Sequence, residues 1–350
     1  MIGRLTNPWN LLLALFGLLA MGHVCSQTVQ PASRGASAHE ERNLTDWLVR
    51  THEASRRRAY TGTFVVSSAN AMASARMWHV CDGTQQLERV DTLTGPRRTT
   101  YRRNDEVITF QPESRLAVQE RRESLGLFPA LLQAQAPTLG EFYRLQHAGL
   151  TDRVAGHDTD VFDLLPRDDL RFGYRIWSEK KTGLMVKLQT LDADHRVLEQ
   201  VAFSDLQLNA PVRIDQLIKQ MQSREGYTVQ QAKVVNTTPQ SQGWQLTAPV
   251  PGFASVSCHT REDTSHAPAA AAQRADKWDR SMQWVFSDGL ASVSVFVEPL
   301  DAARQGADME TASGATHSHS RRQAGHWVTV VGEVPFATLR QFAQRIERTR

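Results

Sequence analysis

Short runs in which apolar and polar residues alternate recur along the first two thirds of the chain and predict strands. In one of them Phe172, Tyr174 and Ile176 alternate with the residues between them, which is the period of a strand with one packed face. Comparable runs lie at 61–68, 76–81, 86–93, 99–103, 106–111, 153–155, 160–165, 184–191 and 197–206. Consecutive runs separated by turn residues predict an antiparallel meander that packs one face and wets the other.

Helical spacing appears beside these strands in two places. Asn43 is able to cap a helix over 44–55, in which Trp47 and other apolar residues fall on one face. The Leu- and Ala-rich segment 127–148, divided by Pro137, predicts further helix. A curved sheet must bury one face, and these helices are the expected cover.

The pattern changes after the second series of strands. Residues 209–239 form a polar connector with apolar residues at helical spacing, and a second strand-rich unit with a terminal helix over 337–348 follows. Loops at 266–274 and 300–322 are expected to be mobile. The predicted layout is a signal peptide at 1–26, a disordered leader at 27–42, a half-barrel domain at 43–210, a linker at 211–240 and a small α+β domain at 241–350.

The N-terminus has the pattern of an export signal. Arg4 supplies positive charge, and an apolar stretch over 11–20 is too short to span a bilayer. Small residues follow, and cleavage after Gly22 and cleavage after Ser26 both fit. The mature chain is therefore expected to be exported and soluble.

Composition and cysteines narrow the function only slightly. The chain is mildly basic, with a net charge of +3 and a pI of about 8.9. Arginine, which outnumbers lysine, suits carboxylate and phosphate partners. Cys81 and Cys258 fall in different predicted domains, so two unpaired thiols are expected and a disulfide is left open.

The motifs of common catalytic and metal sites are absent from the sequence. No nucleophile elbow, phosphate-binding loop or zinc-protease motif occurs. The best metal candidates are His317 and His319, with His326 nearby, in a predicted loop without a carboxylate or Cys partner at ligand spacing. Asp158 and Asp160 share one face of a strand, where surface positions explain them better than a catalytic pair. We therefore expect no enzyme, no metal and no cofactor.

The segment 92–113 predicts a basic hairpin. Asn104 and Asp105 separate two strand-like runs, and both residues tolerate the left-handed backbone of a tight turn. The four arginines of this segment are expected to be exposed and to bind an acidic group. They are Arg97, Arg98, Arg102 and Arg103.

Four motifs in order along the chain resemble the periplasmic sigma-E regulatory protein family, RseB/MucB. They are the hairpin at 95–112, the meander at 153–208, the strand region at 286–295 and the closing strand at 330–335. The resemblance implies that the large domain is an unclosed β-barrel similar to the LolA and LppX lipoprotein carriers, covered by helices. It implies a small C-terminal domain on a linker.

The resemblance also implies a function. Members of the family bind the periplasmic domain of a membrane-spanning anti-sigma factor, shield it from the site-one protease, and are released by lipopolysaccharide-type amphiphiles. The arginines of the hairpin would then meet a headgroup. A lipid or lipoprotein carrier is the alternative, although a carrier would need no second domain. No nucleic-acid partner is expected, and a homodimer is left open.

Overall fold

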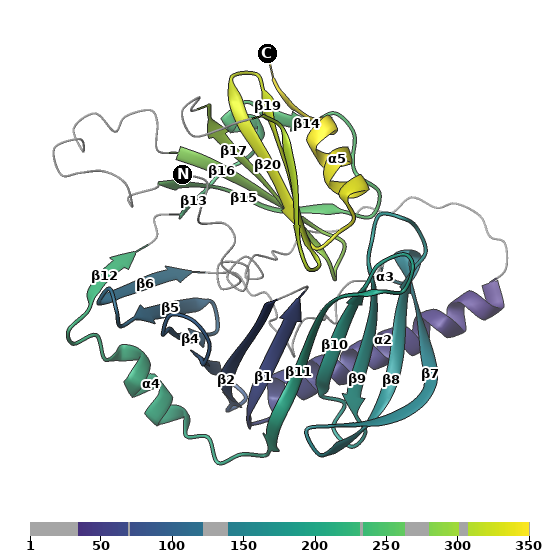
Figure 1. Cartoon of the computed structure of the whole chain (residues 1–350), viewed down its shortest axis with the longest axis vertical. Coiled ribbons are helices and arrows are strands. Elements are labelled where there is room, and N and C mark those ends of the chain that lie inside the picture. The colour runs from purple at the N-terminus through teal and green to yellow at the C-terminus, as the bar shows by residue number, and fades with distance from the viewer. Residues whose placement is uncertain are drawn as a thin grey trace.

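The computed structural model of the chain is mostly β-structure and describes residues 34–68, 71–121, 139–231, 234–262, 280–300 and 307–349. Within these ranges the strands form a 12-stranded sheet, a 7-stranded sheet and a two-stranded ribbon. Figure 1 shows the large sheet curving beside a long helix, with the smaller sheet and its own helix above the central strands of the large sheet.

The large sheet is unclosed. In order across the sheet its strands are β12 (Thr228–Gln231), β6 (Leu116–Arg121), β5 (Glu106–Gln111), β4 (Thr99–Arg103), β3 (Gln86–Thr92), β2 (Ala71–Cys81), β1 (Tyr60–Ser68), β11 (Val197–Leu208), β10 (Met185–Leu191), β9 (Gly173–Glu179), β8 (His157–Pro166) and β7 (Tyr143–Val154). β12 and β7 are its edges, so the strands do not close into a barrel. Strands β1 to β5 and β8 to β11 confirm the alternating runs.

One pairing makes the sheet mixed rather than antiparallel. β12 lies parallel to β6, whereas the other neighbours in the sheet are antiparallel. The chain reaches β12 through helix α4 (Ile214–Gln222), and a crossover of this kind returns a strand in the parallel direction. The prediction of an antiparallel sheet is therefore wrong at this edge. Both α4 and β12 lie in the segment predicted to be a linker.

The first helix confirms the predicted cover of the sheet but begins earlier. Helix α2 (Arg34–Arg57) buries Leu44, Trp47 and Leu48 against the strands. The expected helix begins after Asn43, so the prediction of a disordered leader is wrong from Arg34 onward, and residues 27–33 lie outside the described part. Ala and Glu are strong helix formers, and both recur between Arg34 and Asn43.

The described part of the second predicted helix is mostly a strand. Residues up to 138 of the segment 127–148 lie outside the described ranges, and only Leu139–Phe142 form a short helix, α3. From Tyr143 the chain runs as β7, which pairs with β8 and bulges between His147 and Thr151. Pairing with a neighbouring strand outweighs the helical preference of the Leu, Gln and Ala residues here.

Helix α4 and helix α2 lie on opposite faces of the large sheet. Leu217 and Met221 of α4 pack with Leu87 and Tyr101 of β3 and β4 in one apolar cluster. α2 packs in a different cluster, which contains Met77 of β2. Because successive side chains of a strand point to opposite faces, the two helices bury alternate residues of the same strands.

The smaller sheet is antiparallel and packs against helix α5 (Phe336–Arg345). Its strands, in order, are β13 (Val234–Asn236), β15 (Ala254–Glu262), β16 (Arg280–Ser287), β17 (Ser292–Pro299), β20 (His326–Gly332), β19 (Thr316–Gln323) and β18 (Met309–Ser313). β14 (Trp244–Leu246) pairs with β21 (Ile346–Arg348) after the short turn η1 (Gln240–Gln242). Its core contains Val295, Val330 and Phe342.

The predicted loop over 300–322 contains a hairpin. β18 and β19 pair in regular register around the turn at Gly314. Their sequences are polar, and every residue of the edge strand β18 is exposed. A strand without a buried face leaves no apolar alternation, which is why the sequence pattern missed it.

Candidate functional site

The arginine hairpin forms as predicted. β4 and β5 pair from Thr99 with Phe110 to Arg103 with Glu106, and the two-residue turn lies between them. Asn104 takes a φ of 52°, the left-handed conformation that the turn requires. The amide oxygen of Asn104 also accepts a hydrogen bond from the backbone N–H of Gln86, which ties the turn to β3.

Arg102 is buried, contrary to the expectation that all four arginines are exposed. Its side chain is 8% exposed, and its Nη2 donates to Glu88 Oε1 at 2.8 Å. Glu88 Oε1 lies 3.8 Å from His79 Nε2 on β2. Arg102 therefore belongs to a charged cluster inside the large domain and is not available to an external ligand.

His79 ties this cluster to the end of helix α2. Its ring stacks on Tyr60 at 4.7 Å, and its Nδ1 hydrogen-bonds the carbonyl of Arg58 at 2.7 Å. Burial lowers the pKa of His79, although Glu88 opposes that change. Burial also raises the pKa of Tyr60. We infer that His79 is neutral and that Arg102 carries the positive charge opposite Glu88.

The other three arginines of the predicted cluster lie in different surroundings. Arg103 points to the face opposite Arg102, because adjacent strand residues alternate, and its Nε donates to Gln85 Oε1 at 2.7 Å. Arg97 is exposed and Arg98 is half-buried in the loop before β4. Among the described residues neither Arg97 nor Arg98 forms an ion pair. Within the described part of the chain, the side chains of Arg97 and Arg98 therefore have neither a carboxylate nor a side-chain amide partner, whereas Arg103 is engaged by a neutral amide.

An arginine lies between two aromatic rings beside the hairpin, a contact that the sequence pattern did not predict. The Arg89 guanidinium lies 4.8 Å from the Trp78 ring and 5.6 Å from the Tyr101 ring, between β2 and β4. Arg89 also pairs with Asp91 at 2.6 Å and donates to Gln220 of α4. The strand register could have shown part of this, since Trp78, Arg89 and Tyr101 occupy paired positions.

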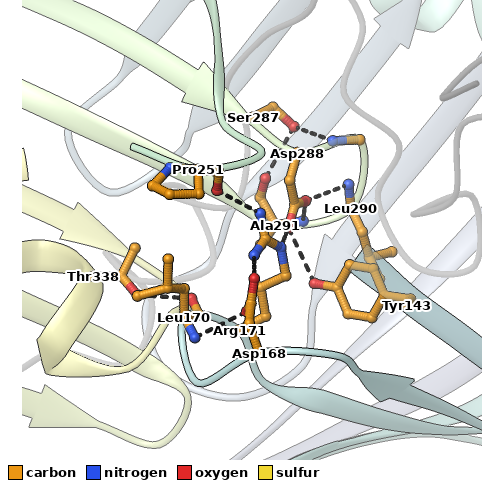
Figure 2. A network of polar contacts seen from close by, with 11 residues as sticks. Tyr143, Asp168, Leu170, Arg171, Pro251, Ser287, Asp288, Leu290, Ala291 and Thr338 are labelled. Atoms are coloured by element: carbon orange, nitrogen blue, oxygen red, sulfur yellow. Dashed lines mark hydrogen bonds and ion pairs between the residues drawn. The ribbon is translucent and has the colours of Figure 1, made fainter. Parts of the chain in front are cut away.

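The two domains meet at a buried arginine, Arg171, which Figure 2 shows at the centre of a polar network. Arg171 lies in the loop between β8 and β9, and its Nε donates to Asp288 Oδ2 at 2.8 Å. Neither side chain is exposed to solvent. Arg171 also donates to Asp168 and, at 2.8 Å, to the carbonyl of Pro251. One side chain therefore joins three separate segments of the chain.

Asp288 is held on every side. Its Oδ1 accepts the backbone N–H groups of Leu290 and Ala291 in the turn between β16 and β17. Its Oδ2 accepts from Arg171 and, at 3.2 Å, from the hydroxyl of Tyr143 at the start of β7. Burial raises the pKa of Asp288, and the amides and Arg171 oppose that rise. Burial and Asp288 raise the pKa of Tyr143, so this phenol remains a donor.

Aromatic contacts extend the junction on both sides of Arg171. The guanidinium lies 4.3 Å from the ring of Phe142 and 4.9 Å from that of Phe253, one from each domain. Cation–π contacts of this kind stabilise most when they are desolvated. The hydroxyl of Thr338 on α5 donates to the carbonyl of Leu170 at 2.7 Å. Apart from the resemblance at 153–208 and 286–295, no sequence pattern predicts this junction.

The remaining candidate residues have ordinary partners. His317 and His319 lie on strand β19 rather than in a loop; His317 stacks on Phe336 at 4.1 Å, and His319 contacts Glu310 at 3.0 Å. Asp158 and Asp160 lie near Arg153 and Lys180. Across the residues that the structure describes, no group of three metal-ligating side chains lies together.

The cysteines and the helices add two findings. Cys81 is half-buried, Cys258 is buried, and both are free thiols, as the sequence predicts. Burial raises the pKa of Cys258 to about 11, so this thiol is unreactive at neutral pH. Among the helices of the described ranges, none has the length and apolar character that crossing a membrane requires.

Two β-sheet domains joined through a buried ion pair define the class of this molecule, a two-domain protein of mostly β-structure. Residues 43–221 match the MucB/RseB N-terminal domain and residues 238–347 match the MucB/RseB C-terminal domain. The chain belongs to the MucB/RseB family. As a member of this regulatory family it is not an enzyme, as the sequence predicts.

Similarity to individual relatives extends over most of the chain. It is 29% identical to the sigma factor AlgU regulatory protein MucB of Pseudomonas aeruginosa over 342 residues, 96% of each chain. It is 23% identical to the sigma-E factor regulatory protein RseB of Escherichia coli K12, over 82% of this chain and 85% of that one.

Solved structures of MucB share both domains. The complex of P. aeruginosa MucA and MucB matches with a TM-score of 0.66 at 26% identity, covering 88% of this chain and 99% of that one. The structure of MucB in complex with MucA(peri) matches with a TM-score of 0.64 at 26% identity, covering 87% and 99%.

Proposed function

We propose that this chain is a periplasmic regulator of an envelope-stress sigma factor. It binds the periplasmic domain of a membrane-spanning anti-sigma factor and shields that domain from the site-one protease. Lipopolysaccharide-type amphiphiles release it, so that cleavage of the anti-sigma factor begins. The export signal predicted at 1–26 would deliver the chain to the compartment where these partners meet.

The observation that carries this proposal is the likeness to MucB over both domains. MucB was solved with MucA(peri), and that structure covers 87% of this chain at a TM-score of 0.64. A carrier would need only the curved sheet and α2. The buried junction around Arg171 joins a second domain to the first, which favours a protein that presents one composite surface to a partner.

A protection assay tests the proposal directly. The periplasmic segment of the cognate anti-sigma factor is exposed to its site-one protease alone, with this protein, and with this protein plus lipopolysaccharide. We expect cleavage to slow with the protein and to recover with the amphiphile. Cleavage at the same rate with a saturating amount of the protein would contradict the shielding role.

Arg97 and Arg98 are the candidates for the amphiphile headgroup. Among the described residues neither has an ion pair, and Arg97 is exposed. Guanidinium groups bind phosphate oxygens through charge-assisted hydrogen bonds. Arg102 and Arg103 are already engaged by Glu88 and Gln85, so we assign them no contact with the ligand.

The double variant Arg97→Ala with Arg98→Ala tests this assignment. We expect weaker binding of lipopolysaccharide at low salt and a smaller difference from the native protein at high salt, because ions screen exposed charges. Arg57→Ala is the matched control, since Arg57 is an exposed arginine on α2, paired with Glu53. Equal binding by the double variant and the control would remove the two arginines from the site.

A lipid or lipoprotein carrier is the second candidate, because an unclosed sheet curves beside α2 (Figure 1). A pull-down of exported proteins with this chain as bait separates the two functions. Recovery of the anti-sigma factor supports the regulator. Recovery of lipoproteins without an anti-sigma factor would favour the carrier.

A further inference from the structure

The two domains make a second contact, away from Arg171, where the turn between β18 and β19 meets the large sheet. Gly314 in this turn has a φ of 60°. A Cβ atom at this position would lie 1.8 Å from Ser68 Oγ on β1 and 2.9 Å from Glu199 Oε2 on β11. The turn therefore approaches the ends of these strands as closely as only a glycine allows.

Two carboxyl groups, one from each domain, lie beside this turn. Glu199 Oε2 lies against Gly314, and Glu333 follows Gly332, which pairs with His317, three residues beyond that glycine. Glu199 comes from β11 of the large sheet, and Glu333 follows β20 of the small sheet. Both are half-buried. Across the described residues neither forms an ion pair with a lysine or an arginine. Two carboxylates this close repel each other, and a proton on one of them removes the repulsion.

The surroundings favour the protonated forms. Burial raises the pKa of Glu199 to about 7, and the Ser68 hydroxyl and the Ala315 amide limit the rise. Burial and the charge of Glu199 raise the pKa of Glu333 to about 8. The pair titrates as a unit, so these two values belong to both groups together.

The other groups around the pair do not supply a compensating positive charge. On the large sheet Tyr174 lies near Glu333, and its own pKa is raised by burial and by that carboxyl, so it is neutral. Beyond Tyr174, Arg171 is already engaged by Asp288. On the small sheet His317 has its pKa lowered by burial, so it is neutral above about pH 6.5.

We propose that Glu199 and Glu333 form a proton-dependent latch that docks the small domain on the large one. The docked arrangement binds a proton between the two carboxyl groups, and the separated arrangement, in which each group is solvated, does not. A ligand that prefers either arrangement would then be linked to pH through the same equilibrium.

The pH dependence of docking follows from the raised pKa values of Glu199 and Glu333. Solvated glutamates titrate near pH 4.5, so below that value both arrangements are protonated and docking has its full strength. As the pH rises through 7 and 8, the docked pair must lose protons that it holds tightly. Docking therefore weakens with rising pH. The ion pair between Arg171 and Asp288 still holds the domains near each other.

Distance measurements between spin labels test the latch in the isolated chain, so the result does not depend on the proposed partner. Labels are placed through Ala193→Cys on the large domain and Gln344→Cys on α5, both exposed, in a background in which the three native cysteines are replaced. We expect a single short distance at pH 5.5 and a longer population that grows as the pH rises to about 8 and then levels off. The ratio of docked to separated molecules is expected to fall about tenfold per pH unit where one proton is released.

Neutral variants identify the groups that respond. Glu333→Gln and, separately, Glu199→Gln should each reduce the response, and the double variant should keep the short distance across the whole pH range, because neither amide can ionise. Glu113→Gln removes an exposed carboxylate in the turn between β5 and β6 and should titrate like the native protein. A native distance that stays constant from pH 5.5 to 9, or a full response in the double variant Glu199→Gln with Glu333→Gln, would overturn the proposal.

Discussion

Two buried arginines have different roles, one inside the large sheet and one at the junction between the domains. Arg102 pairs with Glu88 at 2.8 Å inside the large sheet, and Arg171 pairs with Asp288 at 2.8 Å between the domains. The partners of Arg102 lie on neighbouring strands of one sheet. Arg171 gathers groups from the β8–β9 loop, from Pro251 and from the β16–β17 turn.

What each ion pair stabilises depends on its position in the fold. The Arg102 pair is lost only when the hairpin leaves the sheet, so it supports the fold of one domain. The Arg171 pair can be lost while both domains stay folded, so it supports their relative arrangement. In both cases a buried charge left without its partner is costly, about 3–5 kcal/mol.

The largest effect is expected from Arg171→Leu. This change leaves Asp288 buried without its cation and removes the link to Pro251, so we expect a loss of about 3–5 kcal/mol and separate unfolding of the two domains. Scanning calorimetry would show one transition split into two.

Arg175→Leu is the control for this experiment. Arg175 pairs with Asp163 at 2.7 Å on the large sheet but is 36% exposed, and such pairs contribute about 1 kcal/mol or less. If Arg171→Leu unfolds in one transition at the native temperature, the junction does not couple the domains.

A smaller effect, confined to one domain, is expected from Arg102→Leu. It leaves Glu88 unpaired in the large sheet and should lower the stability of that domain by about 3 kcal/mol. Urea unfolding followed by the fluorescence of Trp78 would report the change, while contacts of the small domain stay intact. Equal destabilisation of both domains would mean that the two arginines are not separable in this way.

The response to acid should differ in sign between the two regions. The pKa of His79 is lowered by burial, so the unfolded chain binds a proton more readily and the large domain loses stability as the pH falls below about 6.5. Docking at Glu199 and Glu333 strengthens over the same range. His79→Asn, whose amide can still donate to the carbonyl of Arg58, should lose the acid sensitivity in thermal unfolding measured from pH 7 to 5.5. Retained sensitivity would assign it to another group.

The smallest effect is expected from Arg97→Ala with Arg98→Ala. These side chains form no ion pair among the described residues, so the free energy of unfolding should change by less than about 0.5 kcal/mol. Equilibrium unfolding in urea checks this, with the native protein alongside. A larger loss would show that the pair supports the hairpin rather than offering charge to a ligand.

Most of the strands could be predicted from the sequence because their alternation reflects burial on one face. β18 and most of β7 could not, since few of their side chains are buried and pairing with one neighbouring strand holds them. The hairpin turn at Asn104 could be predicted from its residue types alone, because Asn and Asp tolerate the left-handed backbone.

Only part of the candidate site could be predicted from the sequence. Thr-Thr-Tyr-Arg-Arg at 99–103 already implies that Arg102 and Arg103 face opposite sides, but not which side is buried. Arg171 and Asp288 are 117 residues apart, and no local pattern links them. Contacts between distant segments depend on how the two sheets pack, which periodicity does not encode.

The connection between the sheets limits what undocking can achieve. Only residues 232 and 233 separate the end of β12 from the start of β13, so the Cα atoms of Gln231 and Val234 are at most about 11 Å apart. A small domain released from Glu199 would remain tethered at high effective concentration. Its return would therefore be fast and independent of protein concentration, and the molecule would behave as a reversible hinge rather than as two dissociating parts.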